Sequence, residues 1–332
     1  MSQPRSVSNR ADNRRSPDKA EGRRASTAAD PVIARWVRRS LAAEPPRAKS
    51  LIVTVWGDSL APHGGGVWLS GLIRLMAPFG INDRLVRTSV FRLARDGWLD
   101  RASHGRVSRY RLTRDGARRF DDAHRRIYDR PADDWHGRWE LVLVDAVPPV
   151  KRSALREELH WAGFGELAGN AFIRPGDPGR ELPSVLVTTA VAGRVVVAEA
   201  CDLPGQRPLA AAVDRAWDLT GLAADYRRFL QRFGAVIERF RTGDDHDPAQ
   251  CFIVRTMLIH AYRRVLLRDP LLPAALLPLD WPGAAAYALC RDFYRVTHRC
   301  AERHLAATLA TNGEVLPPAS PAFHSRFGGL KD

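Results

Sequence analysis

Residues 82–99 carry cations at a spacing that suits contact with a polyanion. Asn82 is a favourable helix N-cap, Asp83 follows in the first turn, and Gly97 is a natural C-terminal stop, so the segment predicts a helix. At 100° per residue one face carries Arg84, Arg87, Thr88, Phe91 and Arg95, with Arg92 at its edge. A face with one sign of charge favours insertion into a DNA groove, whereas a merely solvated face would more often mix both signs. A basic surface for protein partners is the alternative.

The inner face of this segment and the residues before it predict the elements that hold the cations in place. The inner face carries Leu85, Val86, Ser89, Val90 and Leu93. Upstream, apolar side chains recur at helical spacing at Trp68, Leu69, Leu72, Ile73 and Met76. Pro78 and Gly80 then break that helix. Two helices joined by a tight turn predict a helix-turn-helix, with the second as the recognition helix.

A strand pattern follows the predicted recognition helix. Over residues 98–113 one set of side chains alternates with another, and His104-Gly105-Arg106 is suited to a hairpin tip. A hairpin at this place is the wing of a winged helix-turn-helix. Arg106 and Arg109 would then contact phosphates or the minor groove. Thr113 is placed to cap a further helix that runs to about Tyr128.

The charge distribution favours a polyanionic partner for one end of the chain. The net charge of the 332 residues is +14. Residues 131–332 carry 24 basic and 24 acidic side chains, so the whole excess lies within the first 130 residues. A positive field confined to one end indicates that this end alone meets the polyanion.

Residues 51–60, L-I-V-T-V-W-G-D-S-L, contain a possible nucleophile. They resemble the opening block of GDSL-type hydrolases, in which an apolar strand delivers a serine, here Ser59. The chemistry requires a base oriented by an acid. No acid suggests itself for His63, and the two D-x-x-H matches, at residues 121–124 and 133–136, come mid-chain. Esterase activity is therefore the least favoured alternative.

The neutral middle of the chain predicts a small βαββαβ unit. Trp139–Val147 reads as a buried strand, Ser153–Trp161 as a helix with Leu155 and Leu159 inward, and Gly165–Arg174 as two short strands. Residues 182–191 fit either helix or strand, and residues 194–200 fit a strand. This order is typical of a ferredoxin-like domain. Asp145 ends the first strand, where some nucleases of this fold bind a metal, but one carboxylate holds Mg²⁺ poorly.

The C-terminal stretch predicts helices with charged groups on an apolar surface. Residues 251–267 place Arg255, His260, Arg263 and Arg264 among apolar side chains. Buried cations are costly unless they are paired. They indicate either an internal ion-pair network, with Asp269 or Asp280 as partners, or a cationic pocket for an anionic ligand.

Composition excludes several classes of protein. No run of about 18 apolar residues exists, so we expect no transmembrane helix, and the polar start excludes a secretory signal. Cys201, Cys251, Cys290 and Cys300 form no C-x-x-C pair, which favours free buried thiols in a reducing cytoplasm and no metal site. We expect a disordered basic tail over residues 1–45, a winged-helix domain over 46–130, a ferredoxin-like domain over 137–205 and a helical domain over 210–312.

Together these segments resemble the PaaX family of bacterial transcriptional repressors. Four motifs carry the resemblance: L-I-V-T-V-W-G-D-S-L-A-P-H-G-G-G-V-W-L, I-N-D-R-L-V-R-T-S-V-F-R-L-A-R-D-G-W-L, G-R-V-S-R-Y-R-L-T and, late in the chain, D-P-L-L-P-A-A-L-L-P-L-D-W-P-G. It covers roughly residues 49–307 and implies a winged-helix domain, a central domain similar to CRISPR-associated ferredoxin-like nucleases, and a helical C-terminal domain. It also implies that residues 51–58 form a helix and not a strand.

The resemblance implies a repressor of an aromatic-catabolism operon that leaves DNA when an aryl acyl-CoA, typically phenylacetyl-CoA, binds. We therefore expect an α+β, cytoplasmic, homodimeric repressor without a catalytic cofactor. Its partners would be double-stranded operator DNA and an acyl-CoA inducer. DNA contacts would come from Arg84, Arg87, Thr88, Phe91, Arg92, Arg95, Arg106 and Arg109, and ligand contacts from Arg255, His260, Arg263 and Arg264. A metal-dependent nuclease using Asp145 is the main alternative.

Overall fold

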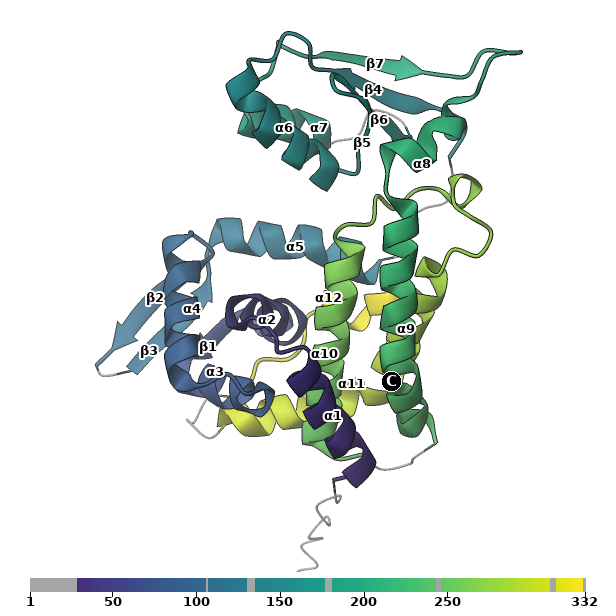
Figure 1. Ribbon diagram of the computed structural model, residues 1–332. Helices are drawn as coiled ribbons and strands as arrows, with labels where there is room; N and C mark the ends of the chain where they lie inside the picture. Colours follow the sequence, from purple (N-terminus) through teal and green to yellow (C-terminus); the bar gives the residue numbers. More distant parts are fainter. Residues whose placement is uncertain are drawn as a thin grey trace, which may run out of the picture.

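Figure 1 shows the computed structural model of the chain, which describes residues 29–105, 107–129, 135–176, 181–242, 246–310 and 315–330. It is a mixed helix and sheet structure. Helices dominate a larger body that carries a three-stranded antiparallel sheet at one side, and a four-stranded antiparallel sheet forms a second, smaller unit above it. Within the described ranges no helix is long and apolar enough to cross a bilayer.

The chain first forms helix α1 (Pro31–Ala43), so the prediction of disorder up to residue 45 is wrong for this segment. The Asp30 side chain caps the helix by accepting from Val32 N at 2.8 Å, and Pro31 occupies the first turn. Ile33 and Val37 are buried one turn apart on the inner face. Burial of these two apolar side chains stabilises a helix in a segment whose basic composition suggested disorder. Residues 1–28 lie outside the described ranges.

The next segment confirms a helix and not a strand. Helix α2 (Ala48–Val55) continues through a π-helical turn (Trp56–Leu60) and a 3₁₀ turn (Ala61–His63). Strand β1 (Gly66–Trp68), helix α3 (Leu69–Met76), a 3₁₀ turn (Ala77–Phe79) and helix α4 (Asp83–Arg95) follow. Gly80, with φ +75°, makes the left-handed turn that ends the α3 segment.

A β-hairpin and a long helix complete this part of the chain. Strands β2 (Leu99–His104) and β3 (Val107–Leu112) pair antiparallel, and β1 adds to the far side of β3. Helix α5 (Arg114–Tyr128) begins at Thr113, whose side chain accepts from Gly116 N at 2.8 Å. The predicted cap and the predicted end of this helix are both confirmed. In Figure 1, α5 lies across the top of the helical body, facing the smaller unit.

The smaller unit has the element order β4 (Trp139–Leu143), α6 (Pro149–Trp161), β5 (Gly165–Ala168), β6 (Ala171–Pro175), α7 (Glu181–Thr188) and β7 (Val196–Ala200). Its strand order is β5-β6-β4-β7. The helix with Leu155 and Leu159 buried is confirmed, and the predicted strands are present, but the first ends at Leu143 and not at Val147. The segment that fitted either type is helical at α7, and α6 and α7 lie on the side of the sheet that faces α5.

The remaining chain is helical, as predicted. It contains α8 (Val213–Ala216), α9 (Leu219–Arg241), α10 (Pro248–Leu266), α11 (Gly283–Ala310) and α12 (Pro321–His324). Short 3₁₀ turns lie at Leu209–Ala212, Ala274–Leu276 and Arg326–Gly328. All four cysteines are free thiols; Cys251, Cys290 and Cys300 are buried, and Cys201 is exposed, contrary to expectation.

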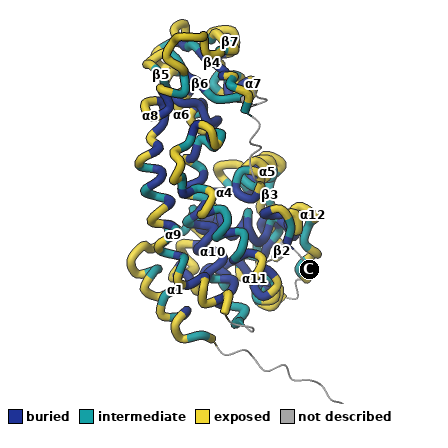
Figure 2. The backbone as a smooth tube through the Cα atoms, turned by 90° about the vertical axis from the view of Figure 1, so that its right-hand side faces the viewer, coloured by how far each residue is buried: buried dark blue, intermediate teal, exposed yellow. Residues whose placement is uncertain are grey.

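One hydrophobic core joins the two ends of the chain. Buried apolar side chains of α1 to α5 form a continuous cluster with those of α9, α10 and α11 and with the last described residues, up to Leu330. The smaller unit has cores of its own on the two faces of its sheet. Figure 2 shows buried positions concentrated where these helices face one another. The N-terminal helices therefore cannot leave the C-terminal helices without exposing this core to water.

Candidate nucleic-acid interface and the cavity behind it

Helix α4 presents a basic outer surface. Asn82 caps it, its side chain accepting from Leu85 N at 3.0 Å, and Val86, Ser89, Val90 and Leu93 are buried. The outer side chains are all exposed: Arg84, Arg87, Thr88, Phe91, Arg92 and Arg95. Phe91 is 65% exposed, an unusual state for a large apolar ring. The helix thus has the orientation that a groove-binding helix requires.

Two details of α4 differ from or add to the prediction. Leu85, predicted on the inner face, is 47% exposed because it lies in the first turn, at the edge of the buried stripe. Arg87 donates to Asp83 one turn earlier, and both side chains are more than half exposed. Such exposed i,i+4 pairs contribute only about 0.3–0.5 kcal/mol, so the guanidinium can exchange this carboxylate for another acceptor.

The hairpin beside α4 is also basic. Arg109 is exposed and its guanidinium lies 5.9 Å from the centre of the Trp68 ring on β1. Arg101, on β2, donates to Ser108 across the hairpin at 3.1 Å and lies directly opposite Tyr110. The sequence analysis did not name Arg101, although the alternation of side chains along the hairpin gives this position. Arg106, predicted at the tip, lies outside the described residues.

Behind these elements, Asp58 is the centre of a buried polar network. Its side chain is 1% exposed, and Oδ1 accepts hydrogen bonds from the hydroxyls of Tyr128 and Tyr294, both at 2.6 Å. On the other carboxylate oxygen, Oδ2, Arg255 Nε lies at 3.2 Å. These partners come from α5, α11 and α10, so the network joins three helices to the turn after α2.

Arg326 closes the network from the C-terminal side. It is fully buried, and its Nη1 donates to the backbone oxygen of Asp58 at 2.8 Å. Its guanidinium lies 4.1 Å from the centre of the Tyr128 ring and 4.9 Å from that of Phe323. Cation–π contacts and hydrogen bonds thus replace the water that the charge loses on burial. The predicted domains end at residue 312 and leave this segment out, although Phe323, three residues before Arg326, supplies one of the rings against the cation.

The prediction that Arg255 binds a ligand is wrong, and the ion-pair alternative holds with other partners. Arg255 is fully buried, with Nη1 2.9 Å from Glu302 Oε1 in addition to its contact with Asp58. Neither Asp269 nor Asp280 is its partner: Asp269 accepts from Tyr226, and Asp280 pairs with Arg227. A cation held between two carboxylates inside the core has no surface to offer an incoming phosphate.

The same network accounts for the hydrolase-like motif. Ser59 is fully buried, donates to Asp58 at 3.3 Å and accepts from Arg255 Nη2 at 3.1 Å. His63 contacts Glu302 and the backbone oxygen of Pro317 instead. Gly57 is required for packing, because a Cβ there would stand 2.8 Å from the Phe120 ring. In this structure the motif serves helix packing and an ion pair, not an exposed nucleophile.

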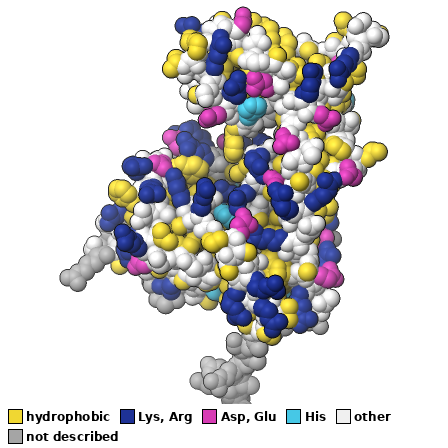
Figure 3. All heavy atoms as spheres, viewed as in Figure 1, with side chains coloured by type: hydrophobic (Ala, Val, Ile, Leu, Met, Phe, Trp, Pro, Cys, Tyr) yellow, Lys and Arg dark blue, Asp and Glu magenta, His cyan; other side chains and the backbone are white. Residues whose placement is uncertain are grey.

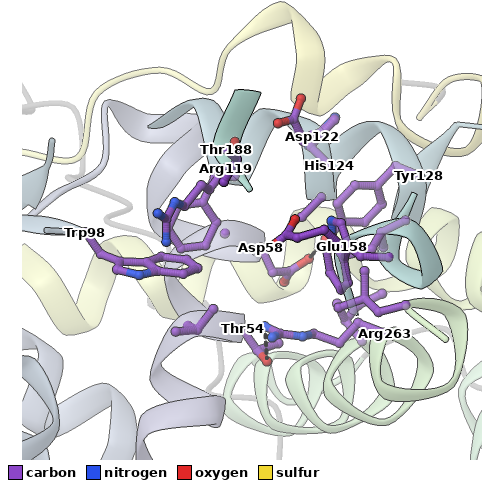
Figure 4. Close-up of a pocket in the computed structure, with 18 residues that line it drawn as sticks. Thr54, Asp58, Trp98, Arg119, Asp122, His124, Tyr128, Glu158, Thr188 and Arg263 are labelled. Atoms are coloured by element: carbon purple, nitrogen blue, oxygen red, sulfur yellow. Dashed lines mark hydrogen bonds between the residues drawn. The ribbon is translucent and has the colours of Figure 1, made fainter. Parts of the chain in front are cut away.

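A cavity of about 480 Å³ lies above this network. It is lined by residues of α2, α5, α6, α7 and α10, where the helical body meets the smaller unit (Figure 4). Its apolar walls include Trp98, Phe120, Trp161 and Ile259, and its polar groups include Thr54, Asp58, Arg119, Asp122, His124, Glu158 and Arg263. A volume of this size with a few convergent polar groups is typical of small-molecule sites.

Two cationic groups line the cavity, and one histidine in it is held neutral. In Figure 4, Arg263 extends from α10 to Thr54, to which it donates at 3.2 Å. Its buried Nε has no hydrogen-bond partner among the described residues. Arg119 approaches from α5 and lies 5.1 Å from the Trp98 ring. Burial, assisted by the charge of Arg326, lowers the pKa of His124 to about 4.

The other two predicted ligand residues do not line this cavity. His260 contacts Thr54 Oγ1 through Nδ1 at 2.8 Å, and burial, with the charge of Arg263, lowers its pKa to about 4. Arg264 is exposed on another side of α10 and pairs with Glu44 at 2.6 Å. Ile259 and Arg263, one helical turn apart, face the cavity, whereas His260 and Arg264 each lie one position further along and point to a different side of α10.

Asp145 is not part of a metal site in the described residues. It does not end the strand as predicted but is exposed in the turn after β4, and its backbone oxygen accepts from Arg152. No group of three or more histidine, cysteine or carboxylate side chains suited to a metal ion occurs within the described part of the chain. The nuclease alternative therefore gains no support from this geometry.

Comparison with known proteins gives the family. Family models match in three consecutive segments: PaaX-like protein over residues 47–116, PaaX protein central Cas2-like domain over 132–212, and PaaX-like protein C-terminal domain over 217–307. The chain is also 34% identical over 299 residues to the Transcriptional repressor PaaX of Escherichia coli (strain K12), which covers 89% of this chain and 94% of that protein. The chain belongs to the PaaX family. A solved structure, the uncharacterized protein Rv0674 from Mycobacterium tuberculosis, matches with 32% identity and a TM-score of 0.52 over 79% of this chain and 98% of that one.

The three matched family segments contribute differently to the basic surface, the cavity and the buried network. The basic surface of α4 and the hairpin lies inside the PaaX-like segment, and the cavity has walls from residues of all three segments or the helix that links them. Arg326 lies beyond the last PaaX segment, yet it completes the buried network. Arg126, on the linking helix α5, donates to the backbone oxygen of Trp161 on α6 at 3.3 Å and to that of Asp269.

Proposed function

We propose that this protein is a DNA-binding transcriptional repressor of an aromatic, phenylacetate-type catabolic operon in the cytoplasm. The observation that carries the proposal is the outer face of α4, where four arginines, a threonine and an exposed phenylalanine stand opposite a fully buried stripe. The similarity to a protein named as a transcriptional repressor supports the same function.

In this proposal α3 and α4 form the helix-turn-helix and β2 and β3 the wing. Arg84, Arg87, Thr88 and Arg92 read or flank base edges in the major groove, with Phe91 and Arg95 beside them. Arg109, with Arg101 and Arg106, contacts the backbone beside the groove. The strand order β5-β6-β4-β7 supports a ferredoxin-like central domain. The proposed domains are a winged-helix domain that begins at α1 and not at residue 46, a ferredoxin-like domain over residues 137–205 and a helical domain over residues 210–312.

A homodimer is the proposed DNA-binding form. Two copies related by a two-fold axis would place two α4 helices in successive major grooves, about one helical turn apart. The operator would then contain two inverted half-sites. Analytical ultracentrifugation with and without operator DNA measures this state directly, and a single chain on a full operator would contradict it.

An aryl acyl-CoA, such as phenylacetyl-CoA, is the proposed effector, and the 480 Å³ cavity is its proposed site. The aromatic walls suit the aryl group, and Arg263 and Arg119 suit the polar and anionic parts of the ligand. The cavity is too small for a whole CoA, so the nucleotide end would extend beyond its edge. Because α5 forms one wall and follows β3 directly, an occupant can displace the hairpin and α4. The effector must bind the DNA-free form more tightly.

Fluorescence anisotropy with DNA from upstream of the protein's own gene and of neighbouring catabolic genes tests this function. We expect specific binding that phenylacetyl-CoA, and not free CoA, reverses. Specific binding that no acyl-CoA reverses would rule out the proposed effector and leave the proposed repressor function in place. Absence of specific binding at physiological salt would overturn the repressor.

A further inference from the structure

Helix α1 carries a basic surface that the α4 interface does not explain. Arg35, Arg38 and Arg39 are all exposed on its outer side, at positions i, i+3 and i+4. Within the described residues no carboxylate pairs with any of them, because the acids at the two ends of α1 are taken: Asp30 pairs with Arg239, and Glu44 with both Arg232 and Arg264. The surface therefore keeps its whole charge in the free protein.

The helix that carries these arginines is firmly placed. The Trp36 indole donates to the backbone oxygen of Arg232 on α9 at 3.3 Å and packs edge-on against Phe233. At the start of α1, Asp30 and Gln250 exchange two hydrogen bonds, at 2.9 and 2.8 Å. The outward cations are thus presented by a rigid element and not by a loose tail, which lowers the entropy lost on binding.

The basic surface continues from α1 along α9 and α10. An open groove beside α1 is lined by Arg35, Arg39 and Arg232, and a second groove that shares Arg232 is lined by Arg228, Arg264 and Arg268. The carboxylates here are outnumbered, since Asp225 serves both Arg228 and Arg268 just as Glu44 serves two arginines. In Figure 3, basic side chains gather over α1 on the face that also carries the basic side chains of the α4 region.

We propose that the outer face of α1 is a second DNA-binding surface, which contacts the phosphates of the duplex flanking the segment bound by α4. This rests on the proposed DNA-binding function. The arginines continue from one turn of α1 to those along α9 and α10, and a basic surface of this extent suits a polymer of regularly spaced phosphates better than a compact anionic ligand. Three such contacts add affinity for any sequence and increase its dependence on salt.

The test compares wild type with the triple variant Arg35→Gln, Arg38→Gln, Arg39→Gln, which removes charge and keeps helix-forming side chains. A matched control removes three exposed arginines from the region of the smaller unit: Arg194→Gln, Arg207→Gln, Arg215→Gln. Circular dichroism checks that each variant is folded. Anisotropy is measured on the shortest protected upstream duplex, on the same duplex extended by ten random base pairs on each side, and on a random 40-base-pair duplex, from 50 to 200 mM salt.

We expect the triple variant to lose the affinity that the flanks add, and to flatten the slope of log affinity against log salt by up to about 2.7, or about 0.9 per phosphate contact. The control variant and the preference for the protected sequence should not change. Equal slopes for wild type and triple variant on the long duplexes would overturn the proposal, whether or not α4 is the recognition helix. If wild type shows no sequence preference but the triple variant weakens random-duplex binding, the repressor function fails and the α1 surface stands.

Discussion

The guanidinium of Arg255 lies 3.2 Å from the carboxylate of Asp58, and both side chains are fully buried. One residue follows helix α2 near the start of the chain and the other belongs to α10, almost 200 residues later. Because Tyr128 and Tyr294 also donate to Asp58, the carboxylate holds the N-terminal and C-terminal helices in one arrangement. The relative position of the N-terminal and C-terminal helices therefore depends on this ion pair and these hydrogen bonds as well as on apolar burial.

Replacing Asp58 by asparagine should therefore destabilise the fold severely. Arg255 and Arg326 would lose a buried counter-charge, and breaking a buried pair from one side costs about 3–5 kcal/mol. Denaturant unfolding followed by circular dichroism measures the loss. Asp122→Asn is the matched control, since it breaks only the exposed pair with Arg125 and should cost about 1 kcal/mol or less. Equal stabilities of the two variants would contradict the role of the network.

Arg87→Ala should weaken specific DNA binding by about 1–3 kcal/mol and relax the preference at one base position. Arg87 stands in the middle of the exposed face of α4, and its free-state partner Asp83 lies on the same helix. Competition anisotropy with single-base operator variants measures both effects. Arg118→Ala removes an equally exposed helical pair, with Asp115, and should leave specificity intact. Unchanged affinity of the Arg87 variant would disprove the assignment of α4 as the recognition helix.

Arg109→Gln should act differently from Arg87→Ala. A wing residue that contacts phosphate contributes equally on every sequence, so its loss should lower the salt slope by about 0.9 without changing specificity. Affinities for operator and random duplex at four salt concentrations give the slope and the specificity ratio. A change in base preference would show that Arg109 reads bases instead.

Arg263→Met should reduce the affinity for phenylacetyl-CoA by roughly tenfold or more, since a hydrogen bond to a charged group is worth about 1.5–3 kcal/mol. Methionine keeps the buried length of the side chain and removes only its charge and donors. Isothermal titration compares it with Arg264→Met, one residue on and outside the cavity. Wild-type affinity in the Arg263 variant, or an equal loss in both, would argue against this cavity as the effector site.

Stability should fall as the pH drops from about 6.5 towards 4. His124 and His260 both have pKa values lowered to about 4, mainly by burial, so each is neutral in the fold while the unfolded chain takes up a proton below about 6.5. The unfolded state therefore binds more protons in this window and is favoured as the pH falls. Urea midpoints at pH 7, 6 and 5 measure the effect, and His260→Asn should make the decline shallower. A pH dependence identical to that of wild type would refute this role of His260.

Local patterns predicted α4 and α5 well, because the signals lie within each helix: Asn82 and Thr113 cap them, and buried positions recur at helical spacing. Helix α1 was missed because its basic composition concealed Ile33 and Val37. The partners of Arg255 could not be read from the sequence, since they lie 197 residues before it and 47 after it, and nothing local marks a carboxylate as buried. The cavity is assembled by three distant segments, so only Arg263 among its charged groups was foreseen.

The position of Arg326 has a consequence for how the protein folds during its synthesis. Its contacts with Asp58 and Gly57 join residues that lie 268 and 269 positions apart along the chain. During synthesis, the turn that follows α2 is therefore made long before the cation that its buried carboxylate contacts. The N-terminal core stays incomplete until Arg326 has left the ribosome. Contacts of such long sequence separation also make for slow folding.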